Sequence, residues 1–312
     1  MNPLGRILIV DDDPLFREAY EDVLGKEGYE VEAVTDGEAA VGALEAGRDF
    51  DVVLLDMRLR GAEGPNNGLD FLSEIQQRAP FAKIIVVTGF AERQPIKEAF
   101  AAGAYDFMAK QGPQFQALLQ AKVRNALELT RERRLAALGD AEVEAEIKDV
   151  YARVRTEKDS HRKGALLEEL MVLLFKSVRG FGGVSTRRRS DLEEIDLVIP
   201  NESPDPVWQK EGSYLLGECK NWSSRVGRAE FDAFRSKLKR RFGRCRLGFF
   251  VATGGFTEPF LDVQESYRTD SDGIVVVPIG PEDLARLVEA SDRNAELRKL
   301  HERSILPAKS WG

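Results

Sequence analysis

The sequence contains very little cysteine and histidine. Its 312 residues include two cysteines, Cys219 and Cys245, and two histidines, His161 and His301. Two cysteines cannot form a disulfide framework, and two histidines leave little scope for a zinc site or for histidine-based catalysis. Charged residues make up 31% of the chain, so carboxylates and lysines are the expected carriers of any chemistry.

Long apolar runs are also missing. No stretch approaches the roughly 18 apolar residues that a membrane helix needs. The first apolar run, Ile7 to Val10, leads into three aspartates, whereas a signal peptide has a longer apolar region and a small-residue cleavage site. With 27 glycines and 13 prolines, collagen and low-complexity disorder are excluded. We therefore expect a soluble, cytoplasmic protein without membrane contact, long enough for about two domains.

Charge divides the chain into unlike parts. Residues 1–112 contain 11 basic and 21 acidic side chains, a net charge of −10, against −8 for the whole chain. The segment from Cys219 to Arg246 contains ten basic and two acidic residues, a net charge of +8. Overall acidity argues against a nucleic-acid partner, but binding depends on the local field, which this segment could supply. A solvated helix face that binds nothing is the alternative for such a run.

Short aliphatic runs alternate with helical patterns in the first 110 or so residues. We predict strands at 7–10, 52–55, 84–87 and 105–109, and a weaker one at 29–34, because such runs are typical of buried parallel strands flanked by helices. The polar residues that directly follow these strands are Asp11, Asp12, Asp56, Thr88 and Lys110. Since the carboxyl ends of parallel strands share one edge of a sheet, these side chains should converge.

The convergent residues suit phosphoryl transfer. Three carboxylates repel one another unless a cation joins them, and an all-oxygen set of ligands suits Mg²⁺. The Lys110 ammonium could pair with charge on the reacting group, and the Thr88 hydroxyl could donate to a phosphoryl oxygen. The sequence thus predicts transfer of a phosphoryl group onto Asp56.

The motifs ILIVDDD, DVVLLD, IIVVTG and GAYDFMAK resemble those of two-component response-regulator receiver domains. The resemblance implies a five-stranded, doubly wound parallel α/β domain in residues 1–112, with Asp56 as the phosphoacceptor. It also implies that Asp11 and Asp12 bind magnesium together with Asp56. The implied switch residues are Thr88, Phe107 and Lys110. The implied partner is a cognate histidine kinase or a small phosphodonor.

Two features depart from the receiver pattern. Two residues separate Lys110 from Pro113, whereas the family usually places proline directly after the lysine. The segment after Asp56, MRLRGAEGPNNG, is longer and richer in turn residues than usual, and it brings Arg58 and Arg60 close to the acceptor. Both departures bear on phosphoryl lifetime and on access of the phosphodonor.

Residues 113–160 lack strand signals and are rich in helix-forming residues. Apolar residues recur at three- and four-residue steps in 119–127 and again in 143–154. Gly139 and Asp140 between these stripes favour two helices or one bent helix. We interpret the segment as a helical connector that could form a dimerising coiled coil, which makes a homodimer the expected assembly. Alternatively the stripes pack on the protein's own domains, and the basic run at 131–134 weakens a strict heptad.

Residues 161–312 carry a second set of chemical groups. GALLEELMVLLFKSV predicts an apolar helix, and IDLVI and YLLGECK predict two strands. Asp196 opens one strand, and Glu218 and Lys220 close the next, so in a hairpin both carboxylates could reach one divalent ion with Lys220 on the face of Glu218. Cys219 then points to the other face, and we interpret its thiol as a small buried hydrophobe. Such a set suits phosphodiester hydrolysis, because a metal ion lowers the pKa of a bound water while the lysine stabilises developing charge.

The order of elements resembles the PD-(D/E)xK restriction-endonuclease-like nucleases, particularly their Mrr-type branch, over roughly residues 164–290. The resemblance implies an α/β domain with a mixed sheet and Mg²⁺ as cofactor, with Mn²⁺ as a further option. The implied catalytic residues are Asp196, Glu218, Lys220 and Glu168, with Glu169 as the alternative to Glu168. Ile195 stands where the family nominally has proline.

Basic residues near these strands could neutralise phosphates and would make affinity depend on salt. The candidates are Arg187, Arg188, Arg189, Arg235, Lys237, Lys239 and Arg240. Trp222 could stack on a base, although an aromatic residue beside a sheet is more often part of the core. No base-reading motif is visible in the sequence.

We therefore expect a response regulator whose output is a phosphorylation-controlled, metal-dependent endonuclease acting on DNA. Phosphorylation of Asp56 would change dimerisation or the placement of the nuclease, and could either license or restrain cutting. One alternative is a phosphorylation-controlled nucleic-acid-binding regulator without turnover. The other is a module that docks a partner protein.

Overall fold

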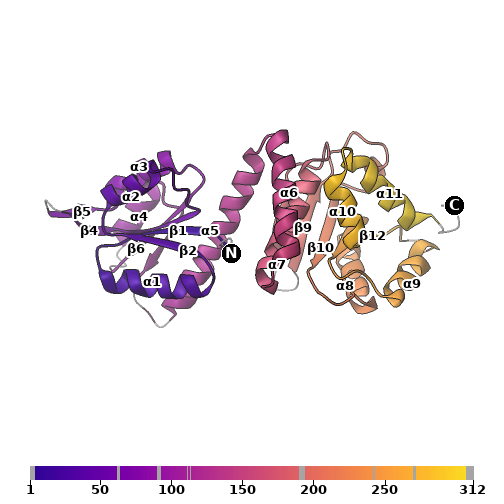
Figure 1. The fold of residues 1–312 in the computed structure, drawn as a ribbon, viewed down its shortest axis with the longest axis horizontal. Helices are drawn as coiled ribbons and strands as arrows, with labels where there is room; N and C mark the ends of the chain where they lie inside the picture. Colours follow the sequence, from indigo (N-terminus) through magenta and orange to yellow (C-terminus); the bar gives the residue numbers. More distant parts are fainter. Residues whose placement is uncertain are drawn as a thin grey trace. The chain divides into compact units, whose positions relative to one another are not determined.

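The computed structural model describes residues 4–61, 64–89, 93–110, 112, 114–189, 194–241, 243–269 and 272–306. The chain divides into two units, Met1–Ala137 and Leu138–Gly312, and each contains one five-stranded sheet (Figure 1). None of the helices in these described ranges is long and apolar enough to cross a membrane.

The sheet of unit 1 is parallel throughout, with the strand order β2-β1-β3-β6-β7. Its strands are β1 (Arg6–Val10), β2 (Glu30–Val34), β3 (Val52–Asp56), β6 (Lys83–Thr88) and β7 (Asp106–Ala109). The strands β3 and β6 are buried along their whole length, as continuous aliphatic runs predict for strands covered on both faces. The predicted doubly wound parallel fold is confirmed.

Helices cover both faces of this sheet (Figure 1). One side carries α2 (Gly37–Glu45), α3 (Leu69–Arg78) and α4 (Arg93–Ala101), and the other carries α1 (Pro14–Lys26) and α5 (Phe115–Ala137). Alternate residues of β1 serve the two cores, because Leu8 and Val10 pack on one side and Ile7 and Ile9 on the other. The polar residues that follow the strands are left at the edge between the two helical layers.

The segment after β3 forms a hairpin that the sequence analysis did not anticipate. Strand β4 (Arg58–Gly61) pairs with β5 (Gly64–Asn67) in antiparallel register. The chain then returns to the sheet at Gly68, where an added Cβ would lie 1.9 Å from the Asp56 carbonyl oxygen, so only glycine permits this approach. The glycine, proline and asparagine residues of this hairpin hid the strand signal, since these residue types are depleted in strands.

Residues 113–160 are largely helical, and their two helices fall in different units. Helix α5 ends unit 1, and α6 (Asp140–Thr156) opens unit 2, where it lies against α7 (Ser160–Lys176). Tyr151 of the second apolar stripe is half-buried. The other stripe residues are only 0 to 4% exposed: Leu119, Val123, Ala126, Leu127, Val143, Ile147, Val150 and Val154. A dimerising coiled coil through these stripes remains a prediction, and it would require them to leave their present packing.

The sheet of unit 2 is mixed, with the order β12-β11-β10-β9-β8. Its strands are β8 (Ser185–Arg189), β9 (Glu194–Pro200), β10 (Tyr214–Lys220), β11 (Leu247–Ala252) and β12 (Val275–Ile279). The pairs β10–β11 and β11–β12 are parallel, whereas β9 is antiparallel to both β8 and β10. The prediction of a mixed sheet with β9 and β10 as an antiparallel pair is confirmed.

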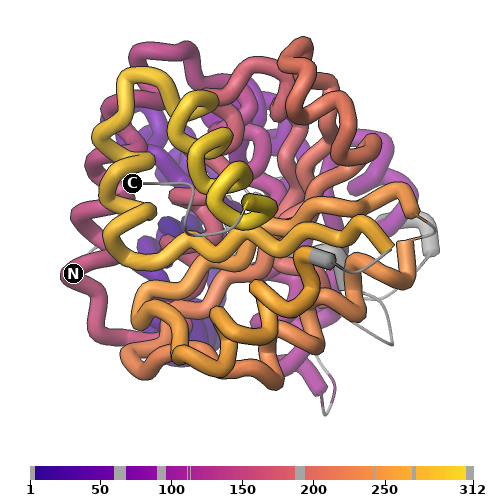
Figure 2. The backbone as a smooth tube through the Cα atoms, turned by 90° about the vertical axis from the view of Figure 1, so that its right-hand side faces the viewer, coloured from indigo at the N-terminus to yellow at the C-terminus, as the bar shows by residue number. Residues whose placement is uncertain are grey.

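Two helical layers enclose this sheet. Helices α8 (Arg228–Lys239) and α9 (Glu258–Ser266) pack on one side through an aromatic core. Helices α10 (Pro281–Glu289) and α11 (Arg293–Ile305) lie on the other side of β12 from α8 and α9 (Figure 2). Two short 3-10 helices, η1 (Trp208–Lys210) and η2 (Tyr267–Thr269), complete the unit. The sequence analysis did not predict α9 or α11.

Candidate functional sites

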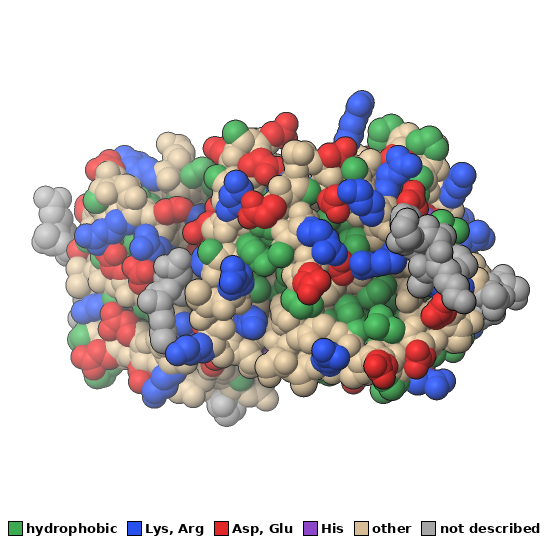
Figure 3. Space-filling view, turned by 45° about the vertical axis from the view of Figure 1, so that its right-hand side comes forward, with side chains coloured by type: hydrophobic (Ala, Val, Ile, Leu, Met, Phe, Trp, Pro, Cys, Tyr) green, Lys and Arg blue, Asp and Glu red, His purple; other side chains and the backbone are tan. Residues whose placement is uncertain are grey.

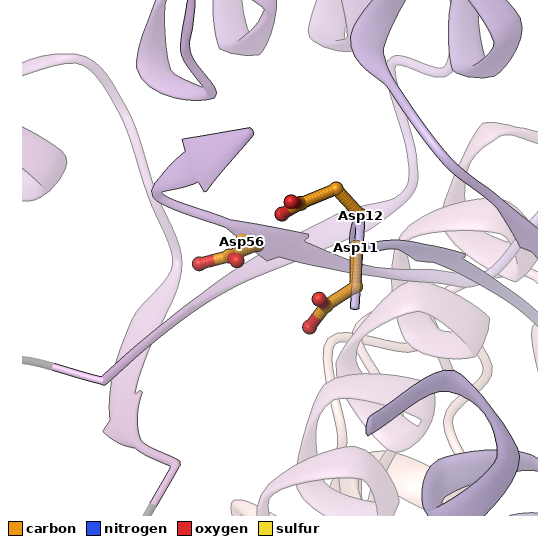
Figure 4. Close-up of side chains that lie close together, drawn as sticks. All are labelled: Asp11, Asp12 and Asp56. Atoms are coloured by element: carbon orange, nitrogen blue, oxygen red, sulfur yellow. The ribbon is translucent and has the colours of Figure 1, made fainter. Parts of the chain in front are cut away.

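Three aspartates meet at the carboxyl edge of the unit 1 sheet (Figure 4). Asp11 and Asp12 follow β1, and Asp56 ends β3. One carboxylate oxygen from each lies within 4.8 Å of the others. Asp11 and Asp56 are buried, whereas Asp12 is partly exposed. Three convergent carboxylates that are open on one side fit the oxygen ligands that Mg²⁺ prefers.

Lys110 joins the two buried aspartates. Its Nζ lies 2.6 Å from Asp11 Oδ2 and 2.7 Å from Asp56 Oδ2. Burial raises the pKa of both carboxyl groups above their usual range, and the hydrogen bonds with Lys110 oppose this rise. Burial by itself would lower the pKa of Lys110, but its hydrogen bonds to both carboxylates raise it. The lysine is therefore charged at neutral pH, and it lies where negative charge added to Asp56 would be.

The predicted switch residues lie on the two neighbouring strands. Thr88 ends β6 and is buried, and its carbonyl oxygen accepts a hydrogen bond of 2.7 Å from the Lys110 amide. Phe107 lies in β7, opposite Val86, and packs partly buried against the core on the α2 to α4 side. The switch roles of both residues remain predictions.

An aromatic pair beneath this site was missed in the sequence analysis. The Lys110 Nζ lies 4.5 Å from the centroid of the Phe16 ring. Tyr20, one helical turn further along α1, is 1% exposed, and its hydroxyl has no hydrogen-bond partner within the part of the chain that the structure describes. Burial and the charges of Asp11 and Asp56 raise the pKa of Tyr20. The four-residue spacing in FREAY was the available signal, because it puts both rings on one helix face.

Asp196, Glu218 and Lys220 come together on adjacent strands of unit 2. Asp196 lies in β9, and its Oδ2 accepts a 2.7 Å hydrogen bond from the Cys219 amide in β10. The Lys220 Nζ lies 2.7 Å from Glu218 Oε1. Burial and the nearby charge of Glu218 raise the pKa of Asp196, while the Cys219 amide and the charge of Lys220 oppose the rise. This arrangement matches the predicted pair of carboxylates with a lysine on the Glu218 side.

Lys237 lies in the same site. Its Nζ is 2.6 Å from Glu218 Oε2, so each oxygen of this carboxylate is held by a different lysine. The sequence analysis placed Lys237 among phosphate contacts, because it belongs to a basic run. Its position three residues after the buried Phe234 and next to the buried Leu238 was the signal for a side chain directed towards the sheet.

The two glutamates of α7 have different surroundings. Burial raises the pKa of the Cys219 thiol well above its usual range, and the charges of Asp196 and Glu168 raise it further. Burial raises the pKa of Glu146 in α6, and the negative charge of Glu169 raises it further. The charge of Glu168 therefore acts near Asp196 and Cys219, whereas that of Glu169 acts at α6, and the choice of Glu168 as the acidic residue of the site stays a prediction. Cys219 is half-buried rather than fully buried, and the raised pKa keeps its thiol neutral.

The two acidic sites differ in compactness. Among the described residues, three ligand atoms within 4.8 Å of one another occur at Asp11, Asp12 and Asp56 alone. Asp196 and Glu218 supply two carboxylates on neighbouring strands, and among the described residues no third ligand atom completes such a group there. A metal ion at the second site would thus be held by two carboxylates, with its other positions open to water and substrate oxygens.

The other predicted phosphate contacts lie in several environments. Lys239 and Arg240 are exposed at the end of α8, and the Lys239 Nζ lies 3.0 Å from Asp272 Oδ2. Arg187, Arg188 and Arg189 belong to the edge strand β8, but their side chains lie outside the described part of the structure. On the face shown in Figure 3, Lys and Arg side chains are interspersed with Asp and Glu.

Arg235, a predicted phosphate contact, is buried against other side chains of its own domain. It is 4% exposed, its Nη2 lies 2.7 Å from Asp272 Oδ2, and its guanidinium carbon lies 3.7 Å from the Tyr267 ring centroid. We predict that Arg235→Met lowers the free energy of unfolding of unit 2 by about 2 kcal/mol, because a charged hydrogen bond and a cation–π contact are lost. All three tryptophans lie in unit 2, so urea unfolding followed by tryptophan fluorescence reports on this unit.

Lys239→Met is the matched control for Arg235→Met. It removes a second, exposed partner of the same Asp272, and exposed pairs contribute about 0 to 1 kcal/mol. Equal destabilisation by the two substitutions would contradict the structural role of Arg235.

Comparison with known proteins identifies the first half of the chain. The model of the response regulator receiver domain family matches residues 7–123. The chemotaxis protein CheY of Thermotoga maritima is 38% identical over 109 residues, which cover 34% of this chain and 84% of that protein. The chain belongs to the response-regulator receiver family. Asp11, Asp12, Asp56, Thr88, Phe107 and Lys110 all fall within its receiver domain.

The receiver domain is followed by a second recognised domain. The model of the Mrr-type restriction endonuclease family matches residues 162–274. This match contains Asp196, Glu218, Lys220 and Lys237, so both predicted family resemblances are confirmed in one chain.

Other relatives share the receiver domain with this protein. The alginate biosynthesis transcriptional regulatory protein AlgB of Pseudomonas aeruginosa is 34% identical over 137 residues, 44% of this chain and 29% of that protein. The chain thus matches less than a third of the length of this relative. A crystal structure of the response regulator protein TrrA from Thermotoga maritima, in complex with Mg²⁺ and BeF, is 31% identical. The aligned region covers 40% of this chain and 100% of the TrrA chain, with a TM-score of 0.35.

Proposed function

We propose that this protein is a response regulator whose output is metal-dependent hydrolysis of phosphodiester bonds in DNA, controlled by phosphorylation of Asp56. The observation that carries the proposal is the group formed by Asp196, Glu218 and Lys220 inside a restriction endonuclease domain. The same chain holds a receiver domain with its acidic site. A phosphorylation site and a hydrolytic site are thereby joined in one molecule.

In the receiver domain, Asp56 acts as the nucleophile. Its carboxylate oxygen attacks the phosphorus of the phosphohistidine of a histidine kinase, or of a small phosphodonor. The bond from phosphorus to the donor breaks as the acyl phosphate forms. Asp11, Asp12 and Asp56 would hold Mg²⁺, which when bound neutralises charge on the phosphoryl oxygens. Lys110 already lies 2.7 Å from Asp56 Oδ2, so it meets the added charge. The Thr88 hydroxyl can then donate to a phosphoryl oxygen.

In the endonuclease domain, Asp196 and Glu218 would hold Mg²⁺ or Mn²⁺, which when bound polarises the phosphate and acidifies a water. Lys220 orients that water or stabilises the charge that develops as the new P–O bond forms and the old one breaks. The Cys219 amide fixes the Asp196 carboxylate against β10 through its 2.7 Å hydrogen bond. Glu168 adds a further negative charge on the Cys219 side of the strand.

Phosphorylation adds about 1.5 to 2 negative charges to Asp56. Helix α5 begins at Phe115, shortly after Lys110, and only Leu138 and Gly139 separate it from α6 of the endonuclease domain. A change at Lys110 can therefore reach the second domain through the helical segment, by altering dimerisation or placement of the nuclease. A bias of about 1 to 3 kcal/mol between two arrangements changes output 5- to 150-fold.

Lys237 gives this proposal a sharp test. Its ammonium lies on Glu218 Oε2, where it repels a cation and can also meet phosphate charge. We predict that Lys237→Met tightens metal binding about tenfold, because a like charge is removed. Cleavage at saturating metal should fall about 100-fold, because a charge that stabilises the phosphate is lost. Calorimetric metal titration and initial cleavage rates measure the two effects separately.

Lys239→Met is again the control, because Lys239 lies on the same helix but is exposed and paired with Asp272. It should leave metal affinity unchanged and cleavage within about twofold. A Lys237→Met variant with unchanged metal affinity and unchanged cleavage would place Lys237 outside the reaction.

The proposed function as a whole is tested with a substrate panel. Full-length protein is incubated with duplex DNA, single-stranded DNA and RNA, with and without Mg²⁺ and with and without acetyl phosphate. We expect Mg²⁺-dependent cleavage of DNA whose rate changes 5- to 150-fold with the phosphodonor. Salt-sensitive binding without cleavage would instead indicate a regulator without turnover. Absence of both binding and cleavage would indicate a module that docks a protein.

A further inference from the structure

Trp222 is exposed, whereas an aromatic residue beside a sheet is usually part of the core. Its relative exposure is 41%, against 0% for Trp208 in the same domain. The third tryptophan of the chain lies outside the described residues. A single exposed apolar residue needs no explanation by itself, but the surroundings of Trp222 are unusual.

Trp222 lies beside the proposed catalytic lysine. The Lys220 Nζ is 5.9 Å from the centroid of the Trp222 ring and 2.7 Å from Glu218 Oε1. One ammonium group therefore links the ring to the carboxylates that would hold the metal. A planar ligand stacked on this ring would lie next to a phosphate bound at that site.

The backbone of Trp222 is held firmly by the end of β11. The Thr253 hydroxyl donates to the Trp222 carbonyl oxygen at 3.2 Å, and the Thr253 amide donates to the Lys220 carbonyl oxygen at 3.0 Å. Gly254 lets these segments come together, because an added Cβ would lie 2.6 Å from the Trp222 carbonyl oxygen. Asn221 is anchored as well, since its side-chain amide donates to the Ser160 carbonyl oxygen. The ring is thus presented on an ordered turn, which lowers the entropy lost on binding a ligand.

Basic side chains also lie close to the turn. Arg225 follows Trp222 closely in sequence and is exposed, and the exposed Arg228 at the start of α8 pairs with Asp232 at 3.4 Å. Basic side chains interleaved with an exposed aromatic ring are the combination that binds single-stranded nucleic acid, where the backbone is neutralised and the bases stack.

We propose that Trp222 is a stacking platform for an unpaired nucleobase of the substrate, next to the phosphodiester bond that is hydrolysed. This inference rests on the proposed nuclease function and adds a preference to it. In a duplex, neighbouring base pairs cover both faces of each base, so stacking on Trp222 requires a single strand, a frayed end or a base rotated out of the helix. The site should therefore favour single-stranded or locally opened DNA over continuous duplex.

Binding by full-length variants tests the proposal. Fluorescence anisotropy is measured without metal, on a labelled single strand of about 16 nucleotides and on the matching duplex. Trp222→Ala is expected to weaken binding of the single strand by roughly 5- to 150-fold, as for the loss of one stacked base, and binding of the duplex by less than about threefold. Trp222→Phe should restore most of the affinity, because phenylalanine also presents a flat aromatic face.

Tyr214→Ala is the matched control. Tyr214 is a 46% exposed aromatic residue at the opposite end of the same strand, β10, and its removal should change neither affinity. Equal weakening of single strand and duplex by Trp222→Ala, or failure of Trp222→Phe to restore binding, would overturn the stacking role. The fluorescence of the remaining tryptophans during urea unfolding checks that each variant is folded.

Loss of the stacking role and loss of the nuclease function give different results in these experiments. If the wild type binds and cuts DNA but Trp222→Ala binds the single strand as tightly, the stacking platform is wrong and the nuclease function stands. If the wild type neither binds nor cuts any nucleic acid, the proposed function is wrong and the stacking platform falls with it.

Discussion

Asp196→Asn should reduce metal-dependent cleavage by on the order of 10³-fold, to the level of the reaction without metal. The substitution keeps the size of the side chain, and its oxygen can still accept the hydrogen bond from the Cys219 amide. It removes the negative charge that, together with Glu218, would hold the cation. Single-turnover cleavage of DNA, measured at several Mg²⁺ concentrations, checks this result.

The loss should not come from unfolding. Burial and Glu218 raise the pKa of Asp196 in the folded protein, so the folded state binds this proton more tightly than the unfolded state. Stability therefore falls as pH rises from the unfolded pKa of about 3.9 through the raised value. At neutral pH the ionised carboxylate is destabilising, and Asp196→Asn should be at least as stable as the wild type.

Asp232→Asn is the control for Asp196→Asn. Asp232 lies on α8 in the same domain and forms an exposed pair with Arg228 at 3.4 Å, so its neutralisation should leave cleavage within about twofold. DNA binding by Asp196→Asn should also persist, because the basic residues remain. Cleavage at the wild-type rate in Asp196→Asn would remove this residue from the reaction.

Asp56→Ala should abolish phosphorylation of the protein. The buried carboxylate at the end of β3 accepts a hydrogen bond from Lys110 and stands within 4.8 Å of two further aspartates, and alanine offers no oxygen to form the acyl phosphate. Label from radioactive acetyl phosphate should therefore fall to background. The 5- to 150-fold effect of the phosphodonor on cleavage should disappear with it, while the basal rate of cleavage remains.

Asp22→Ala is the control in the same domain. Asp22 lies on α1 and pairs with Lys26 on the surface, where its side chain is 60% exposed. This variant should be labelled like the wild type. Equal labelling of Asp56→Ala and Asp22→Ala would show that another residue accepts the phosphoryl group. A phosphodonor effect on cleavage that persists in unlabelled Asp56→Ala would contradict control through this site.

The receiver site was largely predictable because its chemistry follows the strands in sequence. Continuous aliphatic runs such as 52–55 mark strands buried on both faces, and Asp56 comes directly after one of them. Once the sheet is parallel, its topology brings the ends of β1, β3, β6 and β7 to one edge. The convergence of Asp11, Asp56 and Lys110 therefore follows from local patterns and one general rule of parallel sheets.

Interactions that depend on which face of an element points inward were not predictable in the same way. Arg235 and Lys237 are two residues apart in one basic run, yet the first is buried against Asp272 and Tyr267 and the second binds Glu218. Charge counted along a sequence carries no information about the direction of a side chain. The hairpin of β4 and β5 was missed for a related reason, because strand pairing overrode the turn-forming composition of its residues.

The amino-acid sequence was enough to predict the two domain families, which the comparisons confirm. It was also enough to propose the five strand-end residues of the receiver site and the carboxylates and lysine of the second site. These features depend on residue type and on spacing within short segments. Three features come from the packing alone: Glu168 raises the pKa of Cys219 whereas Glu169 raises that of Glu146, Lys237 holds Glu218, and Trp222 is exposed beside Lys220. Each of these depends on how separate elements pack, and packing brings together residues whose distance along the chain gives no sign of contact.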